Sequence, residues 1–367
     1  MNTSEDRIIT PKRPSKRILA LDGLRGLIVL SVMFLHAGIF PLGTVGVSVF
    51  FGLSGYLITG ILLDGAASGA APGEVLRAFY MHRALRILPL ALLVALLVGV
   101  VTRAGWSTLW HVSFIQNWFP RHPAPRSLGH YWTLALQEQF YFLWPLVVLL
   151  VPLRRLPWIC IGFLALGAIA RAFVYSTESP LYTELFMRRA TIVAADCIWA
   201  GALVAILARQ GRLTALQGFV VPLLGTSIAA LALLGIWMLE HRHPGSVYVF
   251  RETFLALAIG PAIVLIVSHP AKWLSHPVLR WIGSVSYGLY VIHGVLATWF
   301  WPVRSVPLRF ILIFGLSFPL AALSWRYFES PILRQRRRWP MPTRPTGGPP
   351  VVVAASASGR SGPNIAL

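Results

Sequence analysis

Two side chains in the first apolar stretch, Arg25 and His36, stand eleven residues apart in LDGLRGLIVLSVMFLHAG. If this stretch is helical, the two are offset by only about 20° around the axis and by about 16 Å along it. A charge inside a bilayer costs at least about 2.5 kcal/mol, so it usually faces a cavity or a partner. The chemistry open to such a stripe is proton transfer by the imidazole and anion binding by the guanidinium. The alternative is structural: Asp22 pairs with Arg25, and His36 bonds to a neighbouring helix.

A second group of candidates lies in the motif HYWTLALQEQFYFLWP, at the mouth of a later apolar stretch. Its members are His130, Trp132, Glu138 and Tyr141. We expect Glu138 near the level of His36, where it would orient or charge-stabilise the imidazole, or accept hydrogen bonds from a bound substrate. The alternative for Glu138 is an exposed acid at a helix N-terminus, where negative charge is favourable. Trp132 is better explained as an anchor at the membrane interface.

Asp196 lies within the apolar segment AADCIWAGALVA, where a carboxylate needs a partner. A structural ion pair and a catalytic role are both open for Asp196.

The two cysteines, Cys160 and Cys197, also lie inside apolar runs. They show neither the spacing of metal ligands nor a disulfide framework, so we expect no metal site.

The composition indicates a membrane protein. Of the 367 residues, 56% are hydrophobic and 12% charged, and the mean hydropathy is +0.68. Soluble domains carry about 25% charged residues, so this chain has too little polar surface to face water on all sides. The net charge of +20 gathers largely near the two ends. Basic tails beside anionic lipid account for it, so we expect membrane lipids and no nucleic acid as partners.

The apolar runs predict an all-α polytopic membrane protein with about ten transmembrane helices. The runs cover residues 18–40, 44–63, 87–102, 138–153, 156–174, 190–208, 217–239, 253–269, 284–302 and 308–328. Residues 64–86 and 103–137 are expected to be non-helical connections. An even number of helices places both termini on one side, and the basic N-terminal segment favours the cytoplasm for that side.

Three regions follow from this pattern. Residues 1–17 form a basic cytoplasmic arm, and residues 18–333 form the transmembrane domain. Residues 334–367 form a cytoplasmic tail that is basic and then rich in Pro, Gly, Ala and Ser, a composition typical of disorder.

Six motifs together resemble the acyltransferase-3 family. The Arg, ten residues, then His element of the first run is the hallmark of that family. It is followed, in the family's order, by GVSVFFGLSGYLITGILL, RALRILP, HYWTLALQEQFYFLWP, SYGLYVIH and RYFESP. The likeness covers roughly residues 18–338, nearly all of the predicted membrane domain.

The resemblance implies an O-acyltransferase of the bacterial inner membrane. Such an enzyme moves an acyl group, here expected to be acetyl, from cytoplasmic acyl-CoA to a hydroxyl of a carbohydrate or glycosylated acceptor at the outer face. His36 matches the catalytic histidine, and Arg25, Arg83 and Arg86 match basic residues associated with the donor. His293, in SYGLYVIH, is a second-rank site residue. No tightly bound cofactor is expected beyond acyl-CoA as co-substrate.

The physical chemistry of these residue types agrees with that assignment. A hydroxyl becomes a good nucleophile when a base takes its proton, and imidazole suits this work at neutral pH. Guanidinium groups bind phosphates bidentately, as the coenzyme A head group requires.

The sequence departs from the family pattern at Ser48, His82, Gln137 and Ala194. These departures leave the identity of the acceptor molecule undetermined. The competing function is a transporter or flippase for a lipid-linked or small polar substrate, with Arg25, Asp196 and His36 along its path, although we find no internal repeat of the kind that many transporters show.

Overall fold

The computed structural model describes residues 19–39, 43–119, 125–176, 189–241 and 244–343, and within these ranges the chain forms helices and no strand. The long helices are α1 (Leu19–Ala37), α2 (Gly43–Ala66), α3 (Pro72–Val101), α5 (Trp132–Leu150), α6 (Leu156–Ser176), α9 (Asp196–Arg209), α10 (Leu213–His241), α11 (Pro244–Ser268), α12 (Pro277–Trp299) and α13 (Val306–Ser324). Short helices are α4 (Leu109–Val112), α8 (Thr191–Ala194) and α14 (Ser330–Arg334). The all-α prediction is confirmed.

Each of the ten predicted apolar runs coincides with a helix. Within the described residues, eight helical segments are long and apolar enough to cross a membrane. The remaining two runs correspond to α9 and α12. The first has only 14 residues, and the second has 23 but contains polar groups such as Arg280, Ser286 and His293. The chain is therefore a multi-pass membrane protein whose interior includes two less typical helices.

Helix α3 begins earlier than predicted. Residues 72–86, expected to be part of a non-helical connection, form its first turns, with Pro72 at the start where its missing N–H costs nothing. The 30 residues of α3 span about 45 Å, more than the roughly 30 Å of a bilayer core. Arg83 and Arg86 are therefore held on a rigid helix, in the half of it that precedes the predicted apolar run 87–102.

The folded part also continues past the predicted end of the membrane domain at residue 333. Residues 335–338 form a helical turn, Gln335–Arg338, that packs against α3. There Arg336 Nη2 donates to the carbonyl of His82 at 2.9 Å. The predicted basic arm, residues 1–17, and the tail beyond residue 343 lie outside the described residues.

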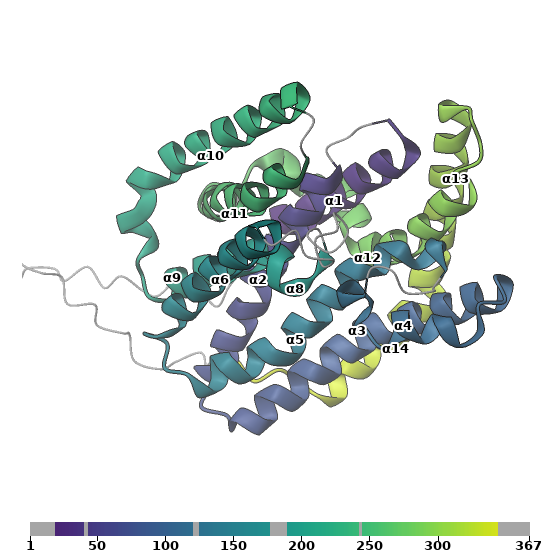
Figure 1. Cartoon of the computed structure of the whole chain (residues 1–367). Helices are drawn as coiled ribbons and strands as arrows, with labels where there is room; N and C mark the ends of the chain where they lie inside the picture. The colour runs from purple at the N-terminus through teal and green to yellow at the C-terminus, as the bar shows by residue number, and fades with distance from the viewer. Residues whose placement is uncertain (1–18, 40–42, 120–124, 177–188, 242–243, 344–367) are drawn as a thin grey trace, which may run out of the picture.

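The centre of the molecule is formed by α1, which packs against both α12 and α2, while α2 packs against α9. In Figure 1, α10 and α13 lie at the periphery on opposite sides of α1. Glycines permit the close approach of α1 and α12. A Cβ on Gly26 would meet the carbonyl of Leu279, and one on Gly283 would meet the carbonyl of Asp22. This close packing aligns the far ends of the two helices, where His36 and His293 lie.

Candidate functional site

His36 on α1 and His293 on α12 form a hydrogen-bonded pair, with 3.1 Å between His36 Nδ1 and His293 Nε2. His293 Nδ1 lies 2.9 Å from the carbonyl oxygen of Leu289, which can only accept, so the proton of a neutral His293 is on Nδ1. Its Nε2 is then an acceptor, and His36 must donate from Nδ1. This assignment leaves the Nε2 of His36 with a free lone pair. His36 has the protonation pattern of a general base.

A third histidine, His130, packs beside this pair, with 5.9 Å between its ring centroid and that of His293. Its Nε2 lies 3.1 Å from the carbonyl oxygen of Val291 and therefore donates. Gly294 makes room for the ring, because a Cβ at that position would overlap it. In the described part of the chain, no three His, Cys, Asp or Glu side chains are arranged to hold a metal ion.

His36 and His130 line a cavity of about 340 Å³, a size within the range of small-molecule sites. Trp132 and Tyr290 contribute aromatic surface to it. Charged groups from several segments complete the lining; they are Arg126, Arg189, Arg251 and Glu252. Arg126 is exposed, Arg189 and Arg251 are half-buried, and Glu252 is buried. The cavity thus leads from an exposed rim to the imidazoles.

A second cavity, of about 70 Å³, contains the three predicted donor-binding arginines, Arg25, Arg83 and Arg86, together with Tyr141. The guanidinium carbon of Arg83 lies 5.5 Å from the centre of the Tyr141 ring, a cation–π contact. Arg86 Nη1 lies 3.2 Å from an oxygen of Glu329, which is near the C-terminal end of the fold. The structure therefore brings together arginines from α1 and α3 as the sequence predicts.

The two cavities share Val32, Val47, Thr133 and Tyr290 in their linings, so they meet inside the helix bundle. At this boundary the Tyr290 hydroxyl donates to the carbonyl of His130 at 2.8 Å and lies 2.5 Å from the Thr133 hydroxyl. Arg25 borders one cavity and His36 the other. The face of α1 that carries Arg25 and His36 therefore runs from the second cavity to the first.

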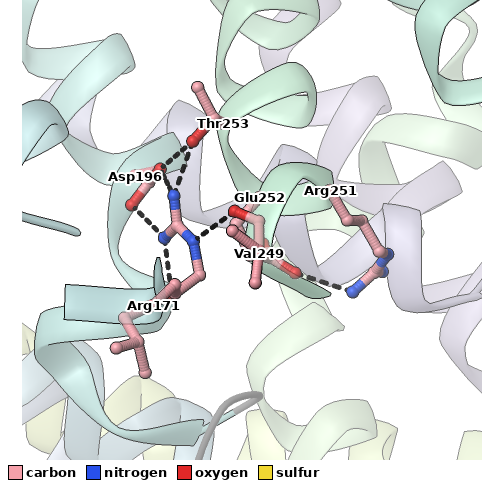
Figure 2. Close-up of polar contacts among 7 residues, drawn as sticks. Arg171, Asp196, Val249, Arg251, Glu252 and Thr253 are labelled. Carbon is pink, nitrogen blue, oxygen red and sulfur yellow. Dashed lines mark hydrogen bonds and ion pairs between the residues drawn. The ribbon is translucent and has the colours of Figure 1, made fainter. Parts of the chain in front are cut away.

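Asp196 belongs to a buried ion pair. Its carboxylate accepts two hydrogen bonds from Arg171, at 2.9 and 2.7 Å, and neither side chain is more than 2% exposed. Arg171 also donates to the carbonyl of Val249 at 2.9 Å and contacts the Thr253 hydroxyl (Figure 2). Of the two roles left open for Asp196, the contacts favour the structural ion pair, which joins α6, α9 and α11.

Glu138 does not line the cavity that holds His36. The positive charge of Arg83 attracts the Glu138 carboxylate electrostatically. Its buried Oε1 has no hydrogen-bond partner among the described residues. No contact among the described residues supports the predicted role of Glu138 beside His36. The side chain that bonds to His36 there is His293. Trp132 packs edge-on against Phe51, with 5.9 Å between ring centroids, inside the first cavity.

The residues of these sites that sequence reasoning missed include Arg171, Tyr290, Arg251 and Glu252. Arg171 was detectable, because a charge inside an apolar run needs a partner. Arg251 and Glu252 fell just before the run predicted at 253–269, whereas α11 begins at Pro244 and includes both. Tyr290 belongs to the motif SYGLYVIH, but only His293 was singled out there.

Comparisons with known proteins agree with these motifs. A family model for an acyltransferase domain matches residues 18–326. Peptidoglycan O-acetyltransferase OatA of Listeria monocytogenes is 29% identical over 364 residues, which cover 88% of this chain and 57% of the relative. YrhL of Bacillus subtilis, provisionally named a peptidoglycan O-acetyltransferase, is 28% identical, with 87% and 55% covered. A Staphylococcus aureus protein provisionally named an O-acetyltransferase is 26% identical, with 89% and 59% covered. The chain thus spans less than two thirds of each relative. No solved structure matches significantly.

Proposed function

Because the chain belongs to the acyltransferase family whose domain model covers residues 18–326, we propose that it transfers an acyl group from acyl-CoA to a hydroxyl of a carbohydrate or glycosylated acceptor. The names of the relatives support acetyl as the acyl group and a cell-envelope polysaccharide as the acceptor class. Acyl-CoA is a co-substrate, and transfer from a thioester to a hydroxyl requires no tightly bound cofactor.

The hydrogen-bonded pair of His36 and His293 carries the proposal. The pair lies beside a cavity of substrate size and leaves the Nε2 of His36 available as a base. The hydroxyl oxygen attacks the thioester carbonyl carbon while its proton moves to this nitrogen. The tetrahedral intermediate then collapses with cleavage of the C–S bond. The proton passes from His36 to the leaving thiolate, so coenzyme A departs as the thiol and the imidazole returns to its neutral form.

The second cavity supports the donor assignment. Arg25, Arg83 and Arg86 gather there, and guanidinium groups bind phosphates through paired, charge-assisted hydrogen bonds. With the head group held by these arginines, the pantetheine arm would extend along α1 towards the boundary at Tyr290 and Thr133. The thioester would then reach His36 from one side of the bundle and the acceptor from the other.

This route assigns the two cavities to opposite faces of the bacterial inner membrane. Acyl-CoA is made in the cytoplasm, so the arginine cavity would face that side, as would both termini. The histidine cavity would face outward, where envelope glycans are found. Support comes from the basic arm that precedes α1 and from the roughly 16 Å between the levels of Arg25 and His36 on one helix.

A transporter is the competing function, because two cavities that meet inside a bundle also suit a translocation path. The His36–His293 pair favours the enzyme, since a path for a small polar solute needs no imidazole with a fixed tautomer.

The test is mass spectrometry of surface glycans from cells that express the wild-type protein or His36→Ala. His269→Ala is the matched control, because this exposed histidine lies outside both cavities. We expect an acyl ester that is present with wild type and His269→Ala and that falls about 10²- to 10⁴-fold with His36→Ala. Equal esterification by a correctly inserted His36→Ala protein would refute the proposed function.

A further inference from the structure

The C-terminal end of the fold packs along the first half of α3. After α13 the chain forms the helical turn Trp325–Glu329, then α14 and the turn Gln335–Arg338, and all three contact α3. Figure 1 shows α14 beside this long helix. Arg86 Nη1 donates to Glu329 Oε2 at 3.2 Å, and Glu329 is buried. The segment 325–338 is therefore fixed next to the arginines of the second cavity.

The last turn of this segment is joined to α3 by reciprocal hydrogen bonds. Arg336 Nη2 donates to the carbonyl of His82 at 2.9 Å. His82 Nε2 lies 3.3 Å from the carbonyl oxygen of Arg336, which only accepts, so this imidazole donates. His82 directly precedes Arg83, and the positive charges of Arg83 and Arg336 are close enough to repel each other. A guanidinium from the far end of the sequence is thus held beside a predicted donor-binding residue.

The second cavity is too small to enclose the head group of coenzyme A. Its volume is about 70 Å³, whereas pockets that enclose small-molecule ligands measure about 300–1,000 Å³. The narrow pantetheine arm or a single phosphate can enter such a space, but the nucleotide must stay at its mouth. Arg83 lines this cavity, and Arg336 lies beside Arg83 without lining it. A phosphate that remains outside the cavity would therefore meet Arg336.

We propose that Arg336 binds the outermost phosphate of the donor, the 3′-phosphate of coenzyme A, while the arginines of the second cavity bind its diphosphate. In coenzyme A the diphosphate joins the pantetheine arm to the adenosine, and the 3′-phosphate lies beyond it on the ribose. The phosphates thus follow one another along the donor in the order in which the arginines lie from the cavity to the C-terminal turn. This inference rests on the proposed O-acyltransferase function.

The hydrogen-bonding state of two arginines agrees with this assignment. Among the described residues, the buried Nε atoms of Arg83 and Arg336 have no hydrogen-bond partner. A buried donor without an acceptor needs an explanation, and a bound phosphate would supply acceptor oxygens to both side chains. Guanidinium groups match phosphates through paired, charge-assisted hydrogen bonds.

The experiment compares acetyl-CoA with acetyl-dephospho-CoA, which lacks only the 3′-phosphate, as donors in membranes that contain the protein. For the wild type we expect a KM for acetyl-dephospho-CoA that is about tenfold to hundredfold higher, because charge-assisted hydrogen bonds to the phosphate are lost. This comparison needs no variant. Equal KM values for the two donors would overturn the inference and leave the proposed function intact, whereas no transfer from acetyl-CoA would overturn both.

Replacement of Arg336 then tests the residue itself. Arg336→Gln should raise the KM for acetyl-CoA by the same factor and leave both kcat and the KM for acetyl-dephospho-CoA unchanged. Arg336→Lys keeps the positive charge and should recover part of the preference for acetyl-CoA. A purely structural role would change the KM for both donors alike, so an equal change for both, or no change for either, would contradict the proposal.

Arg337→Gln is the matched control, since Arg337 is the next residue of the same turn and is exposed. It should keep the wild-type preference between the two donors. If Arg337→Gln lost this preference as fully as Arg336→Gln, the basic character of the turn rather than the position of Arg336 would explain phosphate binding, and the assignment to Arg336 would be wrong.

Discussion

Replacement of His293 by alanine tests whether this residue orients the catalytic base. The side chain is 0% exposed and accepts a hydrogen bond of 3.1 Å from His36 Nδ1. A buried hydrogen bond contributes about 0.5–1.5 kcal/mol, which corresponds to a rate factor of about two to twelve at 25 °C. We therefore expect His293→Ala to slow acyl transfer by at most about tenfold, whereas His36→Ala, which removes the base, should cost about 10²- to 10⁴-fold.

The assay is the initial rate of acetyl transfer from radiolabelled acetyl-CoA into glycans, measured in membranes and normalised to the amount of protein. His293→Gln is the matched variant, because its amide oxygen can accept from His36 Nδ1, and it should recover most of the rate lost by His293→Ala. A loss as deep as that of His36→Ala would show that His293 is itself the base. A wild-type rate in His293→Ala would show that the pair does not orient His36.

Three further changes are predicted. Arg25→Ala should raise the KM for acyl-CoA about tenfold to hundredfold through loss of a charged phosphate contact, and an unchanged KM in donor titrations would remove Arg25 from the donor site. Asp196→Ala leaves Arg171 buried without its counter-ion and should cost about 3–5 kcal/mol, seen as a large fall in the midpoint of thermal unfolding in detergent; an unchanged midpoint would contradict the structural role. Gly294→Ala should displace the His130 ring, cost about 1–3 kcal/mol from overpacking and reduce transfer, so wild-type transfer would show that the ring position is unimportant.

The sequence predicted the helical class and the stripe on α1 because both depend on local patterns. Apolar runs of membrane length and an eleven-residue spacing are properties of a single helix. The gathering of Arg25 with Arg83 and Arg86 was also predicted, although only through motifs that resemble a family. Spacing within one helix could not show which other helix lies opposite.

Contacts between distant segments were harder to predict. The neighbour of His36 is His293, 257 residues away, and periodicity carries no information about such a pair. Glu138 was expected near His36 from its level in the membrane, but helical rotation as well as level determines which cavity a side chain faces. The start of α11 was set too late, because Arg251 and Glu252 interrupt the apolar pattern. Their placement depends on Arg171, a contact that joins three helices.

Transfer across the membrane is the central claim, and sealed vesicles of opposite orientation test it directly. Inverted vesicles from expressing cells expose the face that we assign to the arginine cavity, and radiolabelled acetyl-CoA added outside them should label glycans in the lumen. Right-side-out vesicles should remain unlabelled until they are permeabilised, and His36→Ala vesicles should remain unlabelled in both orientations. Labelling of sealed right-side-out vesicles from outside would place donor and acceptor on the same face and contradict the account.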